Sequence, residues 1–378
     1  MTFCSACTRF SSLLLALVTV VPLLGCGSSE IAPPVPVADA GLVDSATPAL
    51  WTAQGVGIRS TLAAVWGSSA ADVYAVGYSP GGIAHSVDRG ASWSALTLSD
   101  ATELVAVGGS GADDVYVAGN RAAFTPFVMH SKDRGTTWQS SDLGFVGHAR
   151  AIWSSGPSDT YIVGGSTAGA VIAHTVDRGA TWAVSAVAQS AGLHGIWGSG
   201  PKDVYVAGSL RQDSDAGAND AGDGGSTNDA GAIVPEGVVL HTTDQGQTWT
   251  VRTVTPSGGL FAVAGTPDGL RIDAVGDHDT LTESTDHGAT WTQYAGSAAF
   301  PTRTQLTAVW LPSTDDRPYI ASGFDGVLRS IEGVDGAIVT TSEPIPLSVV
   351  LGVWGTGRDV FAVGTGRGGV IGHRVGPQ

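Results

Sequence analysis

Leu62-Ala-Ala-Val-Trp66-Gly67 is the first of three short apolar phrases that decide how this chain folds; Asp72-Val-Tyr-Ala-Val-Gly77 and Ile83-Ala-His-Ser86 follow it. Each phrase has the length and the apolar content of a buried or half-buried β-strand. A polar turn then leads into Ser92-Trp-Ser-Ala-Leu-Thr-Leu98, which has the same character. The stretch therefore predicts four short strands joined by tight turns.

This four-strand unit is repeated along the chain. The position of Trp66 recurs at Gly108, Trp153, Trp197, Ala264, Trp310 and Trp354. The steps are 42 to 46 residues, except for 67 residues between Trp197 and Ala264. Four strands per ~44 residues are typical of a propeller blade. Seven units predict an all-β fold, a seven-bladed β-propeller of four-stranded blades that occupies residues 49–378.

The two ends of the repeat region predict how the ring closes. The last unit stops after its third strand, Val370-Ile-Gly-His373. Ahead of the first unit, Leu50-Trp-Thr-Ala53 matches the fourth-strand phrase Thr290-Trp-Thr-Gln293. We expect this N-terminal strand to complete the C-terminal blade, which leaves no open sheet edge where the ends meet.

The long step contains an insert at residues 211–235 with five Asp and no apolar periodicity. This composition is typical of a low-complexity loop. A calcium site there stays open because carboxylates cluster at short spacing, although the order of Asp, Gly and a final Glu in an EF-hand is absent.

The N-terminus predicts export. Residues 1–25 contain the apolar run Leu13–Leu24, which is shorter than the ~20 residues needed to span a bilayer and has Arg9 ahead of it. The run ends in Leu23-Leu-Gly-Cys26, which resembles the lipobox of bacterial lipoproteins. That resemblance implies a signal peptide cleaved before Cys26, with a lipid such as palmitate on the cysteine. Ordinary secretion with an unmodified cysteine is the alternative.

The residues around the cleavage point extend this expectation. Gly27 in place of Asp implies sorting to the outer membrane, and residues 26–48 are rich in Ser, Pro and Ala, as in a flexible tether. Cleavage removes Cys4 and Cys7, which leaves the mature chain without a disulfide or a cysteine zinc site. The membrane is therefore an expected partner through the lipid alone.

The charge balance excludes another class of partner. The chain has 34 Asp+Glu against 18 Lys+Arg, a net charge of −16. Nucleic-acid binding depends on cations that neutralise phosphates, so we expect no nucleic-acid partner.

The turn after the third strand has a recurring motif, Ser86-Val-Asp-Arg-Gly-Ala-Ser-Trp93. It resembles the Asp-box, or BNR repeat. The aspartates of its five good copies are Asp88, Asp133, Asp177, Asp244 and Asp286. A short Asp side chain can accept backbone N–H bonds across a turn, Gly supplies a positive φ, and Trp packs beneath. Five acids in five separate turns cannot form one catalytic group, so we interpret them as structural.

One third-strand position is shared by His85, His130, His174, His241 and His373. Histidines in separate blades are too far apart to share a metal ion, and we expect each to hydrogen-bond within its own sheet. The sequence thus predicts no metal site, no cofactor and no catalytic residue.

Residues outside the repeats are left to carry function. In a propeller, the turns between strands two and three and the links between blades lie opposite the Asp-box turns. The candidate ligand-binding residues on that face are Arg303, Asp277, His278, Asp279, Arg121, Arg150 and Asp325.

The Asp-box resemblance includes sialidases, so a glycoside hydrolase is the alternative function. Sialidases have six blades, an Arg-Ile-Pro motif and a Tyr nucleophile with a Glu; here Gly57-Ile-Arg-Ser60 lacks that order. Of the tyrosines outside the repeat, neither Tyr78 nor Tyr294 has a neighbouring Glu. For other glycosidases, which need two carboxylates, Asp277, Asp279 and Asp325 are the candidates.

The repeats are also similar to the seven-bladed assembly-factor propellers of photosystem II, which bind partner proteins. Together these observations predict an envelope-anchored, non-catalytic, monomeric propeller that binds a protein or glycan partner.

Overall fold

The computed structural model of the chain describes the residues of the repeat region with short gaps. The described residues are 51–78, 80–97, 103–187, 190–210, 236–255, 258–294, 305–312, 318–323, 327–334, 337–366 and 369–375. The predictions for the signal peptide, Cys26, the tether and the insert 211–235 lie outside these residues, as do Arg303 and Asp325.

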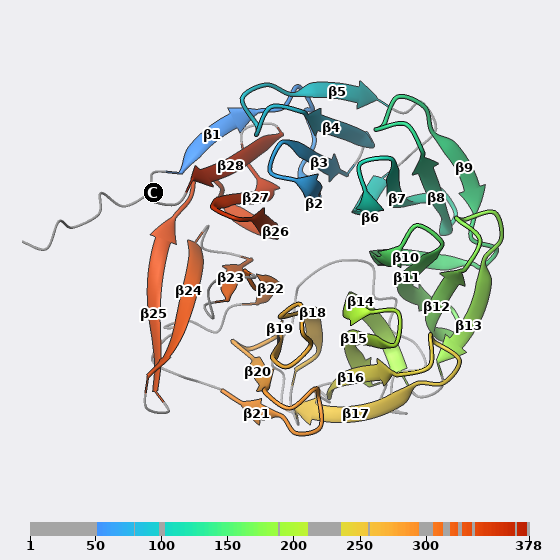
Figure 1. Cartoon of the computed structure of the whole chain (residues 1–378), viewed down its shortest axis with the longest axis vertical. Coiled ribbons are helices and arrows are strands. Elements are labelled where there is room, and N and C mark those ends of the chain that lie inside the picture. Colours follow the sequence, from blue (N-terminus) through green and yellow to red (C-terminus); the bar gives the residue numbers. More distant parts are fainter. Residues whose placement is uncertain are drawn as a thin grey trace, which may run out of the picture. The chain divides into compact units, whose positions relative to one another are not determined.

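Seven four-stranded antiparallel sheets form the fold, arranged as blades in a ring (Figure 1). Blade 1 contains β2 (Leu62–Ser69), β3 (Asp72–Gly77), β4 (Gly82–Ser86) and β5 (Ser94–Thr97). Blade 2 contains β6 (Glu103–Gly111), β7 (Asp114–Arg121), β8 (Thr125–Ser131) and β9 (Gln139–Asp142). Blade 3 contains β10 (Gly147–Gly156), β11 (Asp159–Ser166), β12 (Gly169–Thr175) and β13 (Ala183–Val187).

The remaining blades follow in chain order. Blade 4 contains β14 (Ser190–Gly200), β15 (Asp203–Leu210), β16 (Gly237–Thr242) and β17 (Thr250–Thr255). Blade 5 contains β18 (Leu260–Gly265), β19 (Ile272–Gly276), β20 (Leu281–Ser284) and β21 (Thr292–Gln293). Blade 6 contains β22 (Leu306–Trp310), β23 (Tyr319–Ser322), β24 (Val327–Val334) and β25 (Ala337–Pro344). Blade 7 contains β26 (Val349–Thr356), β27 (Asp359–Thr365) and β28 (Val370–Val375), and β1 (Thr52–Gly55) completes it.

The closing strand confirms the predicted fold in detail. β1 pairs antiparallel with β28, from Thr52 opposite His373 to Gly55 opposite Val370. Trp51, just before β1, donates its indole N–H to Glu343 of blade 6 at 2.8 Å. Glu343 also forms an ion pair with Arg374 of β28 at 3.1 Å. The first and last strands of the propeller are thereby fastened both to each other and to the neighbouring blade.

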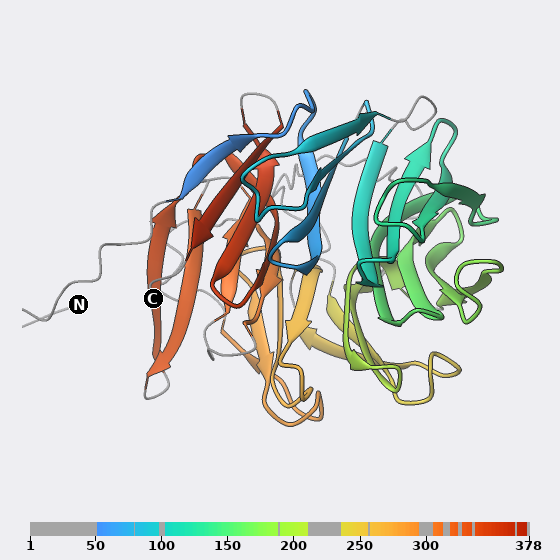
Figure 2. The ribbon, with the colours of Figure 1, turned by 45° about the horizontal axis from the view of Figure 1, so that its top comes forward.

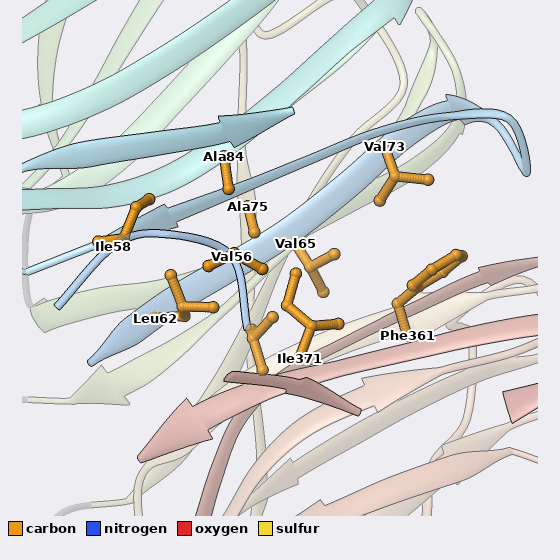
Figure 3. Packing of buried hydrophobic residues seen from close by; sticks show 10 residues of the cluster. Val56, Ile58, Leu62, Val65, Val73, Ala75, Ala84, Phe361 and Ile371 are labelled. Atoms are coloured by element: carbon orange, nitrogen blue, oxygen red, sulfur yellow. The ribbon is translucent and has the colours of Figure 1, made fainter. Parts of the chain in front are cut away.

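The hydrophobic core lies between the blades. Figure 3 shows one of its clusters, in which Val65 and Val73 of blade 1 pack with Phe361 and Ile371 of blade 7. Similar clusters fill the other interfaces. The apolar residues of each repeat therefore pack on both sides of their sheet, because every blade is covered by a neighbouring blade on each face.

The first-strand tryptophans cross these interfaces in a regular way. Each one packs against a glycine of the following blade, where any side chain would bring its Cβ within 2.5–3.0 Å of the indole ring. The pairs are Trp66–Gly109, Trp153–Gly198, Trp197–Gly265, Trp310–Gly355 and Trp354–Gly67. Blades 2 and 5 have Gly108 and Ala264 in place of the tryptophan. In the blade that follows each of them, the glycine position holds a larger residue, Ser154 in blade 3 and Leu311 in blade 6. Ring and glycine therefore form a matched pair at these five interfaces.

Strand alternation defines two faces of the ring. One, called the Asp-turn face here, carries the turns between the first and second and between the third and fourth strands of each blade. The other, the linker face, carries the turns between the second and third strands and the links between blades (Figure 2). In the sequence, the insert 211–235 falls between β15 and β16, outside the described residues.

Candidate functional site

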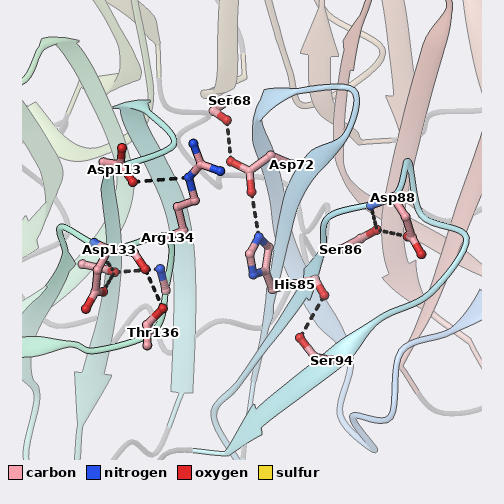
Figure 4. A network of polar contacts seen from close by, with 12 residues as sticks. Ser68, Asp72, His85, Ser86, Asp88, Ser94, Asp113, Asp133, Arg134 and Thr136 are labelled. Carbon is pink, nitrogen blue, oxygen red and sulfur yellow. Dashed lines mark hydrogen bonds and ion pairs between the residues drawn. The ribbon is translucent and has the colours of Figure 1, made fainter.

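The five turn aspartates bind their own turns. In blade 1, Asp88 accepts the backbone N–H of Ser92 at 2.8 Å and its hydroxyl at 2.5 Å. Ser86 donates its hydroxyl to the same carboxylate at 2.9 Å (Figure 4). Gly90 returns its N–H to the Ser86 hydroxyl at 2.8 Å and has φ of 77°. The same bonds recur at Asp133, Asp177, Asp244 and Asp286.

These bonds set the protonation of the turn aspartates. The hydroxyl and the N–H of Thr181 lower the pKa of Asp177 to about 2, and equivalent bonds lower those of Asp244 and Asp286 to about 2. A carboxylate that accepts several hydrogen bonds keeps its charge. Such a group is a poor proton donor, so it cannot act as a general acid near neutral pH.

The five repeat histidines form local pairs, as expected. Each ring Nε2 lies 2.6–2.9 Å from an aspartate oxygen at the start of the second strand of its own blade. The pairs are His85–Asp72, His130–Asp114, His174–Asp159, His241–Asp203 and His373–Asp359. Each histidine also stacks on the adjacent Tyr or Phe, with ring centroids 3.9–4.3 Å apart.

The aspartate partners were present in the repeat but had no predicted role. In blade 1, Asp72 lies between Ser68 and His85 (Figure 4). Burial alone would raise the pKa of Asp72, but the hydrogen bonds from His85 and Ser68 outweigh it and lower the pKa. Their fixed position, two residues before the Tyr or Phe of the second strand, was the available signal. Within the residues that the structure describes, no group of three His, Cys, Asp or Glu is placed to hold a metal ion.

The linker face holds the predicted ligand-binding residues at separate places. Arg121 lies at the rim of blade 2, where it pairs with Asp142, donates to Ser140 at 2.8 Å and covers the Phe127 ring at 4.2 Å. Its guanidinium is therefore engaged within one blade.

The turn of blade 5 on this face carries Asp277, His278 and Asp279. His278 and Asp279 have φ of 55° and 58°, which is uncommon outside Gly and Asn. Gln305 donates to Asp277 at 3.0 Å, which ties the turn to the entrance of blade 6. Asp279 is buried, so Asp277 and His278 are the members of this turn that solvent reaches.

Arg150 occupies a different kind of place, in the innermost strand of blade 3. It is the residue at a β-bulge, an extra residue in the ladder between Ala149 and Ala151. Every innermost strand has a bulge at the same level. The bulged residues, in ring order, are Ala63, Val105, Arg150, His194, Phe261, Thr307 and Leu351. They form a collar around the axis of the propeller, called the bulge collar here.

Two neighbours in the bulge collar touch each other. His194 and Phe261 meet edge to face, with ring centroids 5.4 Å apart. Removal from water and, to a smaller extent, the charge of Arg150 together lower the pKa of His194 to about 3. His194 is therefore neutral beside a cation. The rule that would have found this site is positional, because each collar residue follows the repeated Leu, Ala or Val at the start of the inner strand.

Blade 5 corrects one prediction. The hydroxyl of Tyr294 does have a neighbouring Glu, since it lies 3.5 Å from Glu283 of the adjacent strand. Arg271 pairs with Glu283 at 2.7 Å and with Asp273 at 3.3 Å. Residue spacing hid this contact because the two residues are eleven apart and meet only through strand pairing.

The cluster of Arg271, Asp273 and Glu283 is less accessible than the acids of a glycosidase site. A glycosidase needs two carboxylates that reach a sugar in a cleft. Asp273 is 0% exposed, and burial raises its pKa to about 7. Asp273 is therefore out of reach of a substrate, and Arg271 engages both acids of the cluster.

A groove of about 380 Å³ lies elsewhere, at the outer rim between blades 4 and 5. Its lining residues are Arg252, Thr253, Val254, Ala289, Thr290 and Trp291. None of them is a carboxylate, so the groove has no acid pair for glycoside hydrolysis. In the described part of the chain, no helix is long and apolar enough to cross a membrane.

Comparisons with known proteins bear on the fold. No family model and no curated protein matches the sequence. Among solved structures, YCF48 bound to D1 peptide is 18% identical with a TM-score of 0.60, covering 88% of this chain and 98% of that chain. YCF48 from Cyanidioschyzon merolae is 14% identical with a TM-score of 0.61, covering 87% and 99%. The WD40 propeller of Doa1 is 10% identical with a TM-score of 0.60, covering 87% and 98%. This chain is thus a seven-bladed β-propeller with YCF48 among its structural neighbours.

Proposed function

We propose that this chain is an envelope-anchored, non-catalytic binding protein that holds a partner protein on its linker face. The observation that carries the proposal is Phe124, whose side chain is 56% exposed on that face. Its turn is fixed, because Phe124 accepts the N–H of Gly147 at 2.7 Å and its ring meets His148 at 4.9 Å. A rigid, exposed aromatic side chain is a typical anchor for a protein partner.

The chemistry of the two faces supports this choice. The acids and hydroxyls of the Asp-turn face bond to their own turns, which leaves them little capacity for a ligand. The linker side of the axis instead offers Arg150, His194 and Phe261 of the bulge collar. One structural neighbour, YCF48, has been captured with a peptide, which favours a protein over a glycan as the partner.

The proposal places the chain in the bacterial envelope through a lipid on Cys26, with the outer membrane as the destination and a monomeric ring. The lipobox-like sequence supports the anchor. A Cys26→Ser variant should leave the membrane fraction and lose fatty-acid labelling, as shown by fractionation and by incorporation of labelled palmitate. Persistent labelling of the variant would contradict the anchor but not the binding role.

A photo-reactive amino acid placed at position 124 tests the binding face in growing cells. We expect a covalent adduct with a protein, detected as a protease-sensitive shift in gel mobility. The matched control is position 176, since Val176 is 69% exposed on the Asp-turn face. Equal adducts at both positions, or adducts at 176 alone, would refute the face assignment. A protease-resistant adduct at 124 would identify a glycan and refute the protein partner.

A further inference from the structure

We propose that Arg150, His194 and Phe261 of the bulge collar form a binding site for a carboxylate that is attached to an apolar group. This inference rests on the proposed function, because it names the chemistry that the partner presents to the linker side of the axis. The three residues come from the inner strands of consecutive blades, β10, β14 and β18.

The charge distribution of the collar selects an anion. Arg150 is the charged member of the seven bulged residues, and the other six are apolar, Thr or a neutral His. No described carboxylate lies within ion-pair distance of Arg150, whereas Arg121 one blade away has Asp142. A half-buried guanidinium without a carboxylate is a ready partner for an external one, which it can bind through two parallel N–H bonds.

The neighbours of Arg150 shape the rest of the site. His194 is neutral, so it adds no second charge but offers a ring nitrogen for a hydrogen bond. Phe261 holds the His194 ring edge to face and is half-buried itself. An apolar group next to the carboxylate would pack against Phe261, and the carboxylate would then meet Arg150.

The bulges explain why this site exists at all. In a regular ladder a residue alternates between the two faces of its blade, and those faces are covered by neighbouring blades. A bulge inserts a residue outside that alternation and re-aims its side chain. Polar residues can therefore occupy the collar without entering the apolar interfaces between blades. The same position carries Ala63 and Leu351 in blades 1 and 7, which makes one side of the collar apolar.

The test uses the full-length chain in detergent and two ligands observed by fluorine NMR. The probes are 4-fluorobenzoate, which carries the anion, and 4-fluorobenzamide, which does not. We expect line broadening of the benzoate alone. Arg150→Gln should weaken its binding at least tenfold, because a charge-assisted pair is lost. Arg121→Gln, in the neighbouring blade, should change it less than twofold.

A second variant protects the test against misfolding. Arg150→Lys keeps the charge but loses the planar fork, so binding should fall to an intermediate level. Equal binding of the benzamide, or unchanged binding in Arg150→Gln, would overturn the proposal. The peptides acetyl-Phe-Glu-Phe-amide and acetyl-Phe-Gln-Phe-amide serve as competitors, and displacement by the Glu peptide alone shows that a protein carboxylate fits as well as a free acid.

The two proposals fail in different ways. If benzoate binding depends on Arg150 but position 124 gives no protein adduct, the anion site stands and the protein-binding function falls. If position 124 gives the adduct while benzoate binding ignores Arg150, the function stands and the carboxylate site is wrong.

Discussion

The interface between blades 4 and 5 and the interface between blades 5 and 6 are built on the same backbone positions with opposite chemistry. In the first, Trp197 packs on Gly265, Tyr205 stacks on His241, and His241 bonds Asp203. In the second, strand pairing puts Ala264, Asp273 and Glu283 in the equivalent places. Arg271 occupies the position of the aspartate and Glu283 that of the histidine, so the acidic and basic members of the pair have exchanged places.

The next blade explains why these replacements occur together. Tyr205 packs against Gly288 in the Asp turn of blade 5 and donates to the backbone oxygen of His287 at 2.9 Å. Blade 6 has no such turn; β24 and β25 pair continuously from Val327 opposite Pro344 to Val334 opposite Ala337. The long hairpin is visible at the ring's periphery in Figures 1 and 2. Paired strands therefore occupy the place where the turn glycine contacts the tyrosine ring in the other interface.

The residues that change together therefore belong to one interface between blades and not to one blade. An aromatic side chain and the glycine that accepts it belong to different repeats, so they change together across a blade boundary.

Arg271→Met should have the largest effect, a loss of about 3–5 kcal/mol in the free energy of unfolding at pH 8. It leaves Asp273 and Glu283 buried together without a cation, and breaking a buried pair from one side is strongly destabilising. Urea unfolding measures the loss. Arg252→Met on blade 4, whose guanidinium donates to a backbone oxygen at the exposed rim, should cost less than 1 kcal/mol. Equal losses would contradict a special role for the blade 5–6 cluster.

Gly265→Leu imports the blade 5–6 arrangement into the blade 4–5 interface. The new side chain would meet the Trp197 ring, since even a Cβ there lies 2.5 Å from it. Overpacking should cost about 3 kcal/mol. Adding Trp197→Ala recreates the Ala264–Leu311 pair, so the double variant should be more stable than the sum of the two losses predicts, by at least 1 kcal/mol. Strict additivity in the double-mutant cycle would show that ring and glycine are not matched.

Asp273→Asn should stabilise the protein at high pH. The folded pKa of Asp273 is raised to about 7 from 3.8, so its charged form costs stability as pH rises through that range. The raised pKa already includes the attraction to Arg271, and three pKa units correspond to a gain of at most about 4 kcal/mol in the free energy of unfolding at pH 8. The gain should vanish at pH 4, where the acid is already protonated. Melting curves of the variant and the natural chain at both pH values measure the gain. A gain of equal size at pH 4 would contradict the raised pKa of Asp273.

Tyr205→Phe should have the smallest effect, about 1 kcal/mol, because it removes one hydrogen bond to the next blade and keeps the ring on Gly288. Thermal unfolding of the purified chain measures it. Phe361 already fills the same position in blade 7 against Gly90, which shows that the ring suffices there. A loss above 3 kcal/mol would mean that the hydroxyl, rather than ring packing, holds the interface.

The sequence predicted the ring because its repeated phrases encode strand order directly. The match of Trp51 to the fourth-strand phrase even identified the strand that pairs with His373. The histidine pairs were anticipated as local, yet Asp72 and its equivalents were missed, because a side chain's partner depends on strand register. Register also hid the contact of Tyr294 with Glu283.

The candidate site was harder to predict than the fold. Arg121 and Arg150 are indistinguishable as loop-proximal arginines in the sequence, but one is paired at a rim and the other lies at a bulge. A bulge is a matter of ladder geometry, so the structure was needed to show that the position after the repeated Leu, Ala or Val brings Arg150, His194 and Phe261 onto one collar. The predicted residues Arg303 and Asp325 lie outside the described part of the chain.

The closing strand also determines when the ring can become whole. During synthesis, Thr52 leaves the ribosome 321 residues before His373, whose backbone oxygen its hydroxyl contacts at 3.1 Å. Blade 7 is therefore the last to assemble, however early the other six form, and β1 waits unpaired until the final strand emerges. Contacts between such distant parts of a chain slow folding. A ribosome that stalls before β28 would release a chain with two open sheet edges, and for this protein completeness of translation is itself a condition of solubility.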